Sequence, residues 1–426
     1  MRVRELCRSR LPYGCVYFDA SFADLLLYYR SLMQPDLWAR REHLEADVLR
    51  HFGVGLDQGI VTLSARSALD LLLSVHRFPV GSHVLMSAIN IPDMVRIIET
   101  HGLIPIPIDL DIDTLAPDIE QLKSAVSFRT VAVLIAHIYG RVNALDEIVE
   151  VSREHGLLLI EDCAECFSGT RGSDCYLGNP RSDAVLFSFG AIKPCTAFGG
   201  GVALIRDKSI CVEMRRIHCF RPVRAKKDCL DRILKYSLVM FFLNQPVLID
   251  KIINVLHFLD IEHRELTVSL LRGFPNRFLA RLRRRPEAAL LFLLSRRLDS
   301  YDSEHKKKTL IVSERMAELL PGECQIPGKL TKKTGAWLFP ILVESPDVIV
   351  EQMSLEGIDV YRGATQLGDV PVPVCIKDVP VPKNAKYILN HVVYLPVHKH
   401  VPLQALEVIA QSLDKAVQRS SRTSRL

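Results

Sequence analysis

The sequence predicts an α/β protein, with a largely parallel, buried sheet in a large domain and a smaller α/β domain after it. Between Gly59 and about Ile205, short apolar runs alternate with amphipathic stretches, which is typical of a parallel sheet covered by helices. The chain has 426 residues, 48% of them hydrophobic and 24% charged. This length and composition fit a packed globular protein of two or three domains.

Seven apolar runs are predicted to be strands: 60–63, 84–86, 104–108, 131–135, 157–160, 184–187 and 202–205. Helical patterns at 67–75 and 145–154 lie between them. In the C-terminal part, we expect a helix at 287–298 and strands at 337–343 and 391–395. We therefore divide the chain into an N-terminal segment with the large domain (1–214), an insertion (215–285) and a small C-terminal domain (286–426).

The insertion interrupts the α/β pattern with two basic runs and an apolar stretch at 233–261. Its uncharged part, 236–249, is 14 residues long and contains Pro246, so it is too short to span a bilayer. Two interpretations remain open. The stretch could form a hairpin on an anionic membrane surface, giving peripheral membrane contact through 233–261. Alternatively, it could be a helical pair buried against a partner subunit or the cleft.

Charge and cysteine content narrow the classes of function. The net charge of +5 is too small and too dispersed to indicate a nucleic-acid partner. The 11 cysteines have no repeated spacing, which favours reduced thiols over a disulfide framework. No apolar segment follows the basic N-terminus, so no secretory signal is expected. We expect a cytoplasmic protein, with peripheral contact at a membrane as the open alternative.

Two motifs lie directly after predicted strands. Ser64 can cap the helix that opens at Ala65 and Arg66, and the free amides of that first turn suit a phosphate. Asp162 ends the apolar run at 157–160, at the edge where α/β proteins bind ligands. An acid there can pair with a protonated ring nitrogen. Without a ligand, Ser64 would simply cap a helix, and Asp162 would be an acid that faces solvent.

Cys163 and Cys166 have a C-x-x-C spacing, which also allows a redox or zinc site. A second such pair is missing from the sequence, and so is a nearby pair of histidines. We therefore expect no metal.

A third motif places Ser188 just after a strand and Lys193 five residues further on. The serine can donate to a phosphate, and a desolvated lysine can act as an amine nucleophile. Gly199, Gly200 and Gly201 then permit close approach of the backbone to a ligand. A single loop lysine is usually a surface charge, so the order of the motifs carries the inference.

These residues resemble the DegT/DnrJ/EryC1/StrS family of aminotransferases that use pyridoxal 5'-phosphate and act mainly on nucleotide-linked keto-sugars. The family's E-D-[AC]-A-[QEH] motif corresponds to residues 161–165, and its lysine motif to 188–201. Weaker matches lie at 136–140, 109–113 and 288–299. The resemblance covers most of the chain outside the insertion.

The resemblance implies fold type I, a mostly parallel seven-stranded sheet and an active site shared across a homodimer. Lys193 would hold the cofactor covalently and move a proton, and Asp162 would hold the ring nitrogen. Ser188, Ala65 and Arg66 would hold the phosphate, and Arg66 could instead bind a substrate carboxylate. Glu165 would lie over the ring or beside its phenolic oxygen. Ile91 is assigned to the cofactor site, in a segment where the family usually has an aromatic residue.

Some family features are missing. Ala65 and Arg66 replace the usual Gly-Thr, and the partner subunit's Asn/Arg motif survives at most as Asn276 and Arg277. We expect transfer of an amino group from an amino-acid donor to a keto acceptor, a sugar or related metabolite. Another reaction of the same cofactor, such as elimination, deoxygenation or racemisation, is the first alternative. A non-catalytic, membrane-associated binding module is the second.

Overall fold

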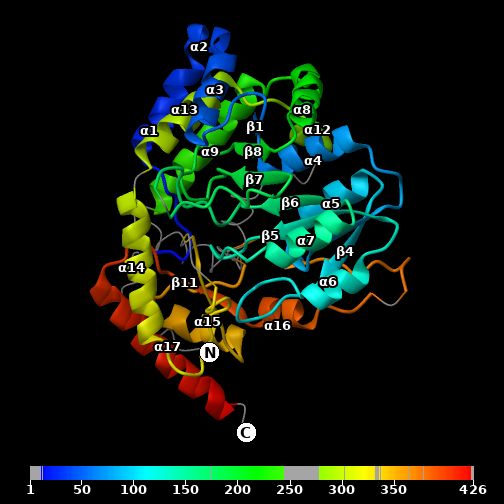
Figure 1. Cartoon of the computed structure of the whole chain (residues 1–426). Coiled ribbons are helices and arrows are strands. Elements are labelled where there is room, and N and C mark those ends of the chain that lie inside the picture. The colour runs from blue at the N-terminus through cyan, green and yellow to red at the C-terminus, as the bar shows by residue number, and fades with distance from the viewer. Residues whose placement is uncertain are drawn as a thin grey trace.

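The computed structural model describes residue 11 and residues 13–423, apart from 173, 244–277, 302, 332–334, 336, 364 and 378. A seven-stranded sheet lies at its centre (Figure 1). Its strand order is β1 (Gly59–Thr62), β8 (Gly201–Ile205), β7 (Ala184–Ser188), β6 (Leu158–Asp162), β5 (Thr130–Ala136), β2 (His83–Ser87) and β4 (Ile104–Ile108). Each coincides with a predicted strand to within two residues. The expectation of a mostly parallel α/β sheet is confirmed, because only β8 runs opposite to the other six strands.

Helices cover both faces of the sheet because its strands bury alternate side chains on opposite sides. One face packs on α4 (Ala65–His76), α5 (Pro92–Thr100), α8 (Lys208–Phe220) and α12 (Phe278–Leu282). The other face packs partly on α6 (Ile119–Ala125) and α7 (Asp146–Glu154). The rest of that face packs on α1 (Phe22–Leu32), α3 (Arg41–His51) and α13 (Ala288–Ser300). In β7, for example, Leu186 faces the first group and Phe187 the last.

The C-terminal part builds a second core around a two-stranded antiparallel sheet of β9 (Phe339–Leu342) and β11 (Val392–Leu395). Three helices pack in that core: α14 (Ser303–Leu319), α15 (Pro346–Leu355) and α17 (Leu403–Thr423). Another helix, α16 (Lys383–His391), joins this part to the large sheet's surroundings, as does the pairing of β10 (Gly368–Asp369) with β3 (Ile89–Asn90). The domain boundaries drawn from the sequence stay a prediction.

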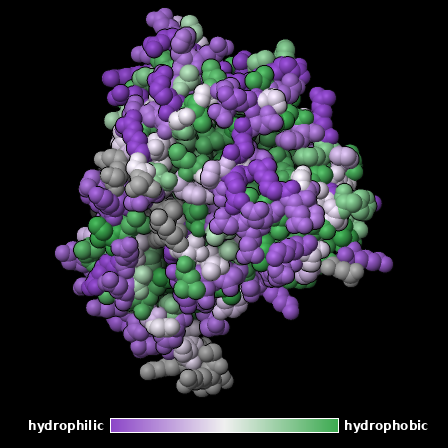
Figure 2. Space-filling view, in the orientation of Figure 1, coloured by the Kyte–Doolittle hydropathy of each residue, from purple (hydrophilic) through white to green (hydrophobic). Residues whose placement is uncertain are grey.

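Within the insertion, the described residues form the end of α8 and α9 (Lys226–Leu243) before 244, and α12 after 277. The inner face of α9 buries Ile233, Tyr236 and Met240 against the cluster that contains α1 and α13. Most of the stretch at 233–261, together with Asn276 and Arg277, lies outside the described residues. In the part of the chain that is described, no helix has the length and apolarity required to cross a membrane. Polar side chains cover most of the face seen in Figure 2, with hydrophobic ones between them.

Candidate active site

Two adjacent strands end at the same edge of the sheet and carry two of the candidate residues. Asp162 is the last residue of β6 and Ser188 the last of β7, and the two strands run parallel, with Asp162 opposite Leu186. The chain then turns, with the Lys193 amide donating to the Gly190 carbonyl at 3.0 Å. Parallel pairing therefore brings Asp162, Ser188 and Lys193 to one edge, where open α/β sheets bind ligands.

The Lys193 amine is held inside the protein. Its Nζ lies 3.2 Å from Oε1 of Glu165, and the side chains of the two residues are 16% and 7% exposed. The other oxygen of Glu165 accepts a hydrogen bond from the Tyr139 amide at 3.1 Å. Lys193 is thus a partly buried amine paired with a carboxylate, and not a solvated surface lysine.

Trp337 covers the same amine from the C-terminal part of the chain. The centroid of an indole ring of Trp337 lies 3.6 Å from Lys193 Nζ, and its Nε1 donates to the Ile192 carbonyl. The residue is 4% exposed. A cation above an aromatic face is attracted to it. The sequence indicated only a strand at this position, so Trp337 is a site residue that sequence reasoning missed.

Asp162 is a buried carboxyl whose charge is costly in the absence of a cationic ligand. It is 7% exposed, and its Oδ1 accepts from the Ala164 amide at 3.0 Å. Burial raises the pKa of Asp162 to about 6, although the Ala164 hydrogen bond and the charge of Lys193 act in the opposite direction. The nearby Glu165 carboxylate raises it further. A positively charged group beside Asp162 would favour the ionised form.

Behind Asp162, a buried network fixes the ends of β5 and β6. The His137 amide donates to the Asp162 carbonyl at 3.0 Å, and His137 Nε2 lies 2.9 Å from Glu161 Oε2. Burial alone would raise the pKa of Glu161, but hydrogen bonds from His137 and Tyr176 hold it below its usual value. His137, Glu161 and Cys163 place three possible metal ligands within 4.8 Å. Both oxygens of Glu161 already accept hydrogen bonds, from Tyr176 and the Asn179 amide among others.

The C-x-x-C pair lies inside the core. Cys163 and Cys166 are free thiols and both are fully buried. Burial, followed by the hydrogen bond with Cys166, raises the pKa of Cys163 well above its usual value. Because the thiolate is the form that binds metal or exchanges disulfides, this environment disfavours the redox and zinc interpretations.

The N-terminus of α4 lies against the glycine-rich turn. Ser64 caps α4 by accepting from the Ser67 amide at 3.2 Å, and the first-turn amides of Ala65 and Arg66 have no acceptor within a helix. A Cβ on Gly201 would come within 2.4 Å of the Ser64 carbonyl carbon, so only glycine permits this approach. Gly201 is also the partner of Ser188 in the sheet. Gly201 therefore lies next to both Ser188 and the start of α4.

Two further candidates are positioned by other partners. The Arg66 guanidinium pairs with the Asp93 carboxylate in the first turn of α5. Ile91 is the N-cap residue of α5 and packs against the cluster beneath α4. The structure thus brings Lys193, Glu165 and Asp162 together, and it places Ser188 and Ala65 next to Gly201. The Arg66 side chain and Ile91 have different surroundings.

The loop of Lys193 is held by buried polar contacts. The carboxylate of Asp19 accepts from the Cys195 amide at 2.7 Å and also pairs with Lys399. Thr196 Oγ1 donates to the Gly190 carbonyl at 2.6 Å. Cys195 has a φ of 54°, in the left-handed region, which a non-glycine residue adopts only where its surroundings hold it. These contacts fix the turn on which the lysine stands.

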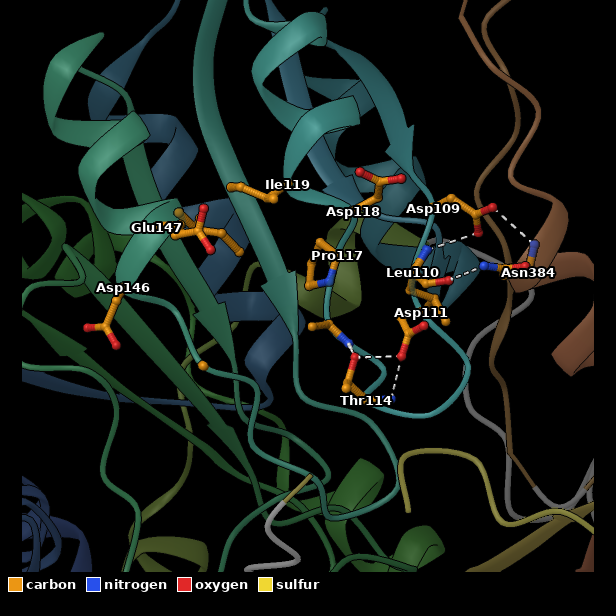
Figure 3. Close-up of a pocket in the computed structure, with 13 residues that line it drawn as sticks. Asp109, Leu110, Asp111, Thr114, Pro117, Asp118, Ile119, Asp146, Glu147 and Asn384 are labelled. Atoms are coloured by element: carbon orange, nitrogen blue, oxygen red, sulfur yellow. Dashed lines mark hydrogen bonds between the residues drawn. The ribbon is translucent and has the colours of Figure 1, made fainter. Parts of the chain in front are cut away.

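A separate acidic hollow of about 500 Å³ lies beside the end of β4 and the starts of α6 and α7. Figure 3 shows Asp109, Asp111, Asp118 and Glu147 around it, with Asn384 entering from α16. Asn384 Nδ2 donates to the Leu110 carbonyl at 2.8 Å, and its amide donates to Asp109 at 3.0 Å. These contacts attach the C-terminal part to the loop at 109–113. The hollow is distinct from the surroundings of Lys193.

Comparison with known proteins identifies the family to which this fold and these residues belong. The model of the DegT/DnrJ/EryC1/StrS aminotransferase family matches residues 38–261. Because the match covers more than half of the chain, the chain belongs to this family.

Two curated relatives are each 30% identical to the chain. One is a GDP-perosamine synthase of Caulobacter vibrioides, over 162 residues, 38% of this chain and 43% of that protein. The other is a dTDP-4-dehydro-2,3,6-trideoxy-D-glucose 4-aminotransferase of Saccharopolyspora spinosa, over 182 residues, 42% of this chain and 46% of that protein. The similarity thus spans less than half of each relative.

Solved structures share the fold over nearly the whole chain. The aminotransferase TlmJ of Streptoalloteichus hindustanus has a TM-score of 0.69 at 17% identity, covering 96% of this chain and 99% of that one. A sugar aminotransferase of Streptococcus pneumoniae, Spr1654 in its PMP form, has a TM-score of 0.70 at 15% identity, covering 98% and 100%. At such identities the likeness shows the fold.

Proposed function

We propose that this protein is a pyridoxal 5'-phosphate-dependent aminotransferase. It would move an amino group from an amino-acid donor to a keto group on a nucleotide-linked sugar or on a related metabolite. The observation that carries the proposal is the pairing of Lys193 with Glu165 at 3.2 Å, next to the buried Asp162. Family membership and the names of the two curated relatives support the keto-sugar acceptor.

The residues present fit the cofactor. A pyridine ring needs a carboxylate at its nitrogen, and Asp162 is a buried carboxyl whose pKa of about 6 would fall beside such a cation. The phosphate needs amide donors, and the start of α4 offers those of Ala65 and Arg66 next to Ser188. The aldehyde needs an amine, which is Lys193.

The chain's own residues would divide the work of the reaction. When bound, pyridoxal 5'-phosphate supplies an aldehyde for the amino group and a ring that accepts electrons. Lys193 would hold the cofactor through its aldehyde and, when its amine is free, carry a proton at Nζ. Glu165 would stabilise the positive charge of Lys193 when its amine is protonated. Asp162 would keep a positive charge at the ring nitrogen, and Trp337 would exclude water from the lysine.

A half-reaction assay tests the proposal. We expect the purified protein with pyridoxal 5'-phosphate to absorb visible light and to lose that absorbance when an amino donor such as glutamate is added. A nucleotide-linked keto-sugar should restore it. Absorbance that persists with every donor would favour elimination, deoxygenation or racemisation. A protein that gains no absorbance with the cofactor would be a binding module.

We also propose that two copies form a homodimer with a shared site, as the family resemblance implies. The family's Asn/Arg motif from the partner subunit would have to come from Asn276 and Arg277 or from another pair. The chain has a mass of 48.0 kDa, and sedimentation equilibrium should give twice that value. A monomer that retains full amino transfer would contradict a shared site.

A further inference from the structure

Three buried nitrogen donors without acceptors belong to neighbouring segments around the end of α8, away from Lys193. They are Arg41 Nη2, Arg221 Nη1 and His218 Nε2, and none has a hydrogen-bond partner within the described residues. His218 is 4% exposed and Arg221 is 8% exposed. Buried polar groups in folded proteins are nearly always paired, so three such groups call for an explanation.

Hydrogen bonds bring the segments that carry the three side chains into one cluster. Arg221 is the C-cap of α8, and its amide donates to the His218 carbonyl at 3.0 Å. The segment at 285–286 lies alongside 221–223, because Arg285 Nε donates to the Arg221 carbonyl at 2.9 Å. Arg41, the first residue of α3, donates from Nε to the Pro286 carbonyl at 3.0 Å. The three donors thus belong to segments that are directly bonded to one another.

The cluster carries more positive charge than its acids balance. Arg215 and Arg285 are close enough to His218 to act on it electrostatically, as are Arg41 and Arg221. Two buried acids face these cations, and both already have partners. Glu45 accepts from Arg215 at 3.1 Å and from the Val61 amide at 3.0 Å. Asp70 accepts from Arg221 Nη2 at 2.6 Å and also binds Arg283 and His101.

The histidine supplies a hydrogen bond without adding charge. Burial, followed by the charge of Arg221 and then of the other arginines, lowers the pKa of His218 to about 3. Its imidazole is therefore neutral near pH 7, and Nε2 can donate when the proton is on that nitrogen. The Arg41 and Arg221 guanidinium groups stay charged and present planar forks that suit oxyanions.

We propose that Arg41, His218 and Arg221 form a binding site for a free inorganic oxyanion of the phosphate or sulfate class. A tetrahedral oxyanion has enough acceptor oxygens to pair with all three donors and one or two negative charges to balance the surplus. The low exposure of His218 and Arg221 favours a small anion over a larger phosphorylated molecule. The ligand would join the start of α3, the end of α8 and the segment at 285–286.

Crystals soaked in sodium selenate test the site directly. We expect an anomalous selenium peak within hydrogen-bonding distance of Arg41 Nη2, Arg221 Nη1 and His218 Nε2. A soaked crystal with no peak there would overturn the proposal.

Calorimetry with inorganic phosphate on the full chain, saturated with pyridoxal 5'-phosphate, gives the matching result in solution. Arg41→Met removes one donor and leaves the Arg221–Asp70 pair intact, and His218→Leu removes another. We expect each to weaken phosphate binding by at least about tenfold, because each loses a hydrogen bond to a charged ligand. Arg216→Met is the matched control, because Arg216 lies on α8, is 58% exposed and pairs with Glu213.

Circular dichroism and thermal melting first establish that the variants fold. Phosphate affinity that is equal in wild type, Arg41→Met and His218→Leu would place the anion elsewhere and overturn the proposal. A nucleoside diphosphate that binds more tightly than phosphate, and loses its affinity in Arg41→Met, would overturn the assignment to a free anion. Weaker binding of the diphosphate supports that assignment.

Discussion

Asp162 links the protein's stability to its proposed function. Its pKa in the folded, cofactor-free protein is about 6, raised by burial from 3.8. Because the pKa of this carboxyl is higher in the folded than in the unfolded protein, its contribution to stability is present below about pH 3.8 and is lost as the pH rises through about 6. The ionised carboxyl therefore destabilises the cofactor-free protein above about pH 6, and a cationic ring nitrogen would relieve that effect.

Asp162→Asn tests this linkage. Without cofactor, we expect the variant to be more stable than wild type by up to about 3 kcal/mol at pH 8, and by about 1 kcal/mol at pH 4.5. Urea unfolding at the two pH values measures the difference. Amino transfer should be lost, because an amide cannot hold the ring nitrogen in its protonated form. A variant that is less stable than wild type at pH 8 would contradict a costly buried charge.

Trp337 is the residue through which the C-terminal part contacts the lysine. Trp337→Leu removes both the ring next to Lys193 Nζ and the hydrogen bond to Ile192. We expect kcat/KM to fall roughly 10- to 100-fold, because the lysine is less precisely held and more accessible to water. The matched control is Trp38→Leu in α2 (Pro35–Ala39), the chain's other tryptophan. Equal losses in both variants would indicate a general effect on folding.

Local sequence predicts some site residues and not others. Asp162, Ser188 and Lys193 could be found because the first two end neighbouring parallel strands and Lys193 stands in the turn that follows, where chain order determines position. Trp337 could not, because it is 145 residues from Ile192 in the chain and follows no strand of the large sheet. Arg66 and Asp93 are 27 residues apart in the chain and lie on different helices. Sequence spacing alone does not predict such an ion pair.

At the scale of elements, the seven strands could be predicted because each is a buried apolar run bounded by polar residues or turns. The packing of helices was less accessible. The helix expected at 287–298 was found as α13, and it packs on α1 and α3 in the cluster of the large sheet. Its sequence is apolar on most sides, so the pattern did not indicate which neighbour it would contact.

The outer face of α9 gives a prediction about membranes. Leu234, Leu238 and Phe241 are 62%, 50% and 48% exposed and recur at helical spacing, with Lys227 and Lys235 on the same helix. We expect the protein to sediment with vesicles of anionic lipid, since apolar area and basic charge act together at such surfaces. Leu234→Ser with Leu238→Ser should reduce binding.

Leu355→Ser is the control for that experiment, because Leu355 is a leucine of α15 with 58% exposure. Co-sedimentation that is absent with both neutral and anionic vesicles would remove the membrane interpretation. The helix face would then be left for a partner subunit.

At the scale of the whole molecule, the C-terminal part completes the site built by the large sheet. It reaches the lysine loop through Trp337 and through the pair of Lys399 with Asp19, and it reaches the loop at 109–113 through Asn384. Asp19 in turn holds the Cys195 amide, two residues after the lysine. Contacts far apart in the chain thus position one short turn.

The central claim is that Lys193 holds the cofactor. The most direct measurement is to add pyridoxal 5'-phosphate to the purified protein, reduce the mixture with borohydride, digest it and locate the modified lysine by mass spectrometry. The structure predicts a pyridoxyl phosphate group on Lys193 and its loss in Lys193→Arg. Stoichiometric labelling of a different lysine, or none at any lysine, would contradict it.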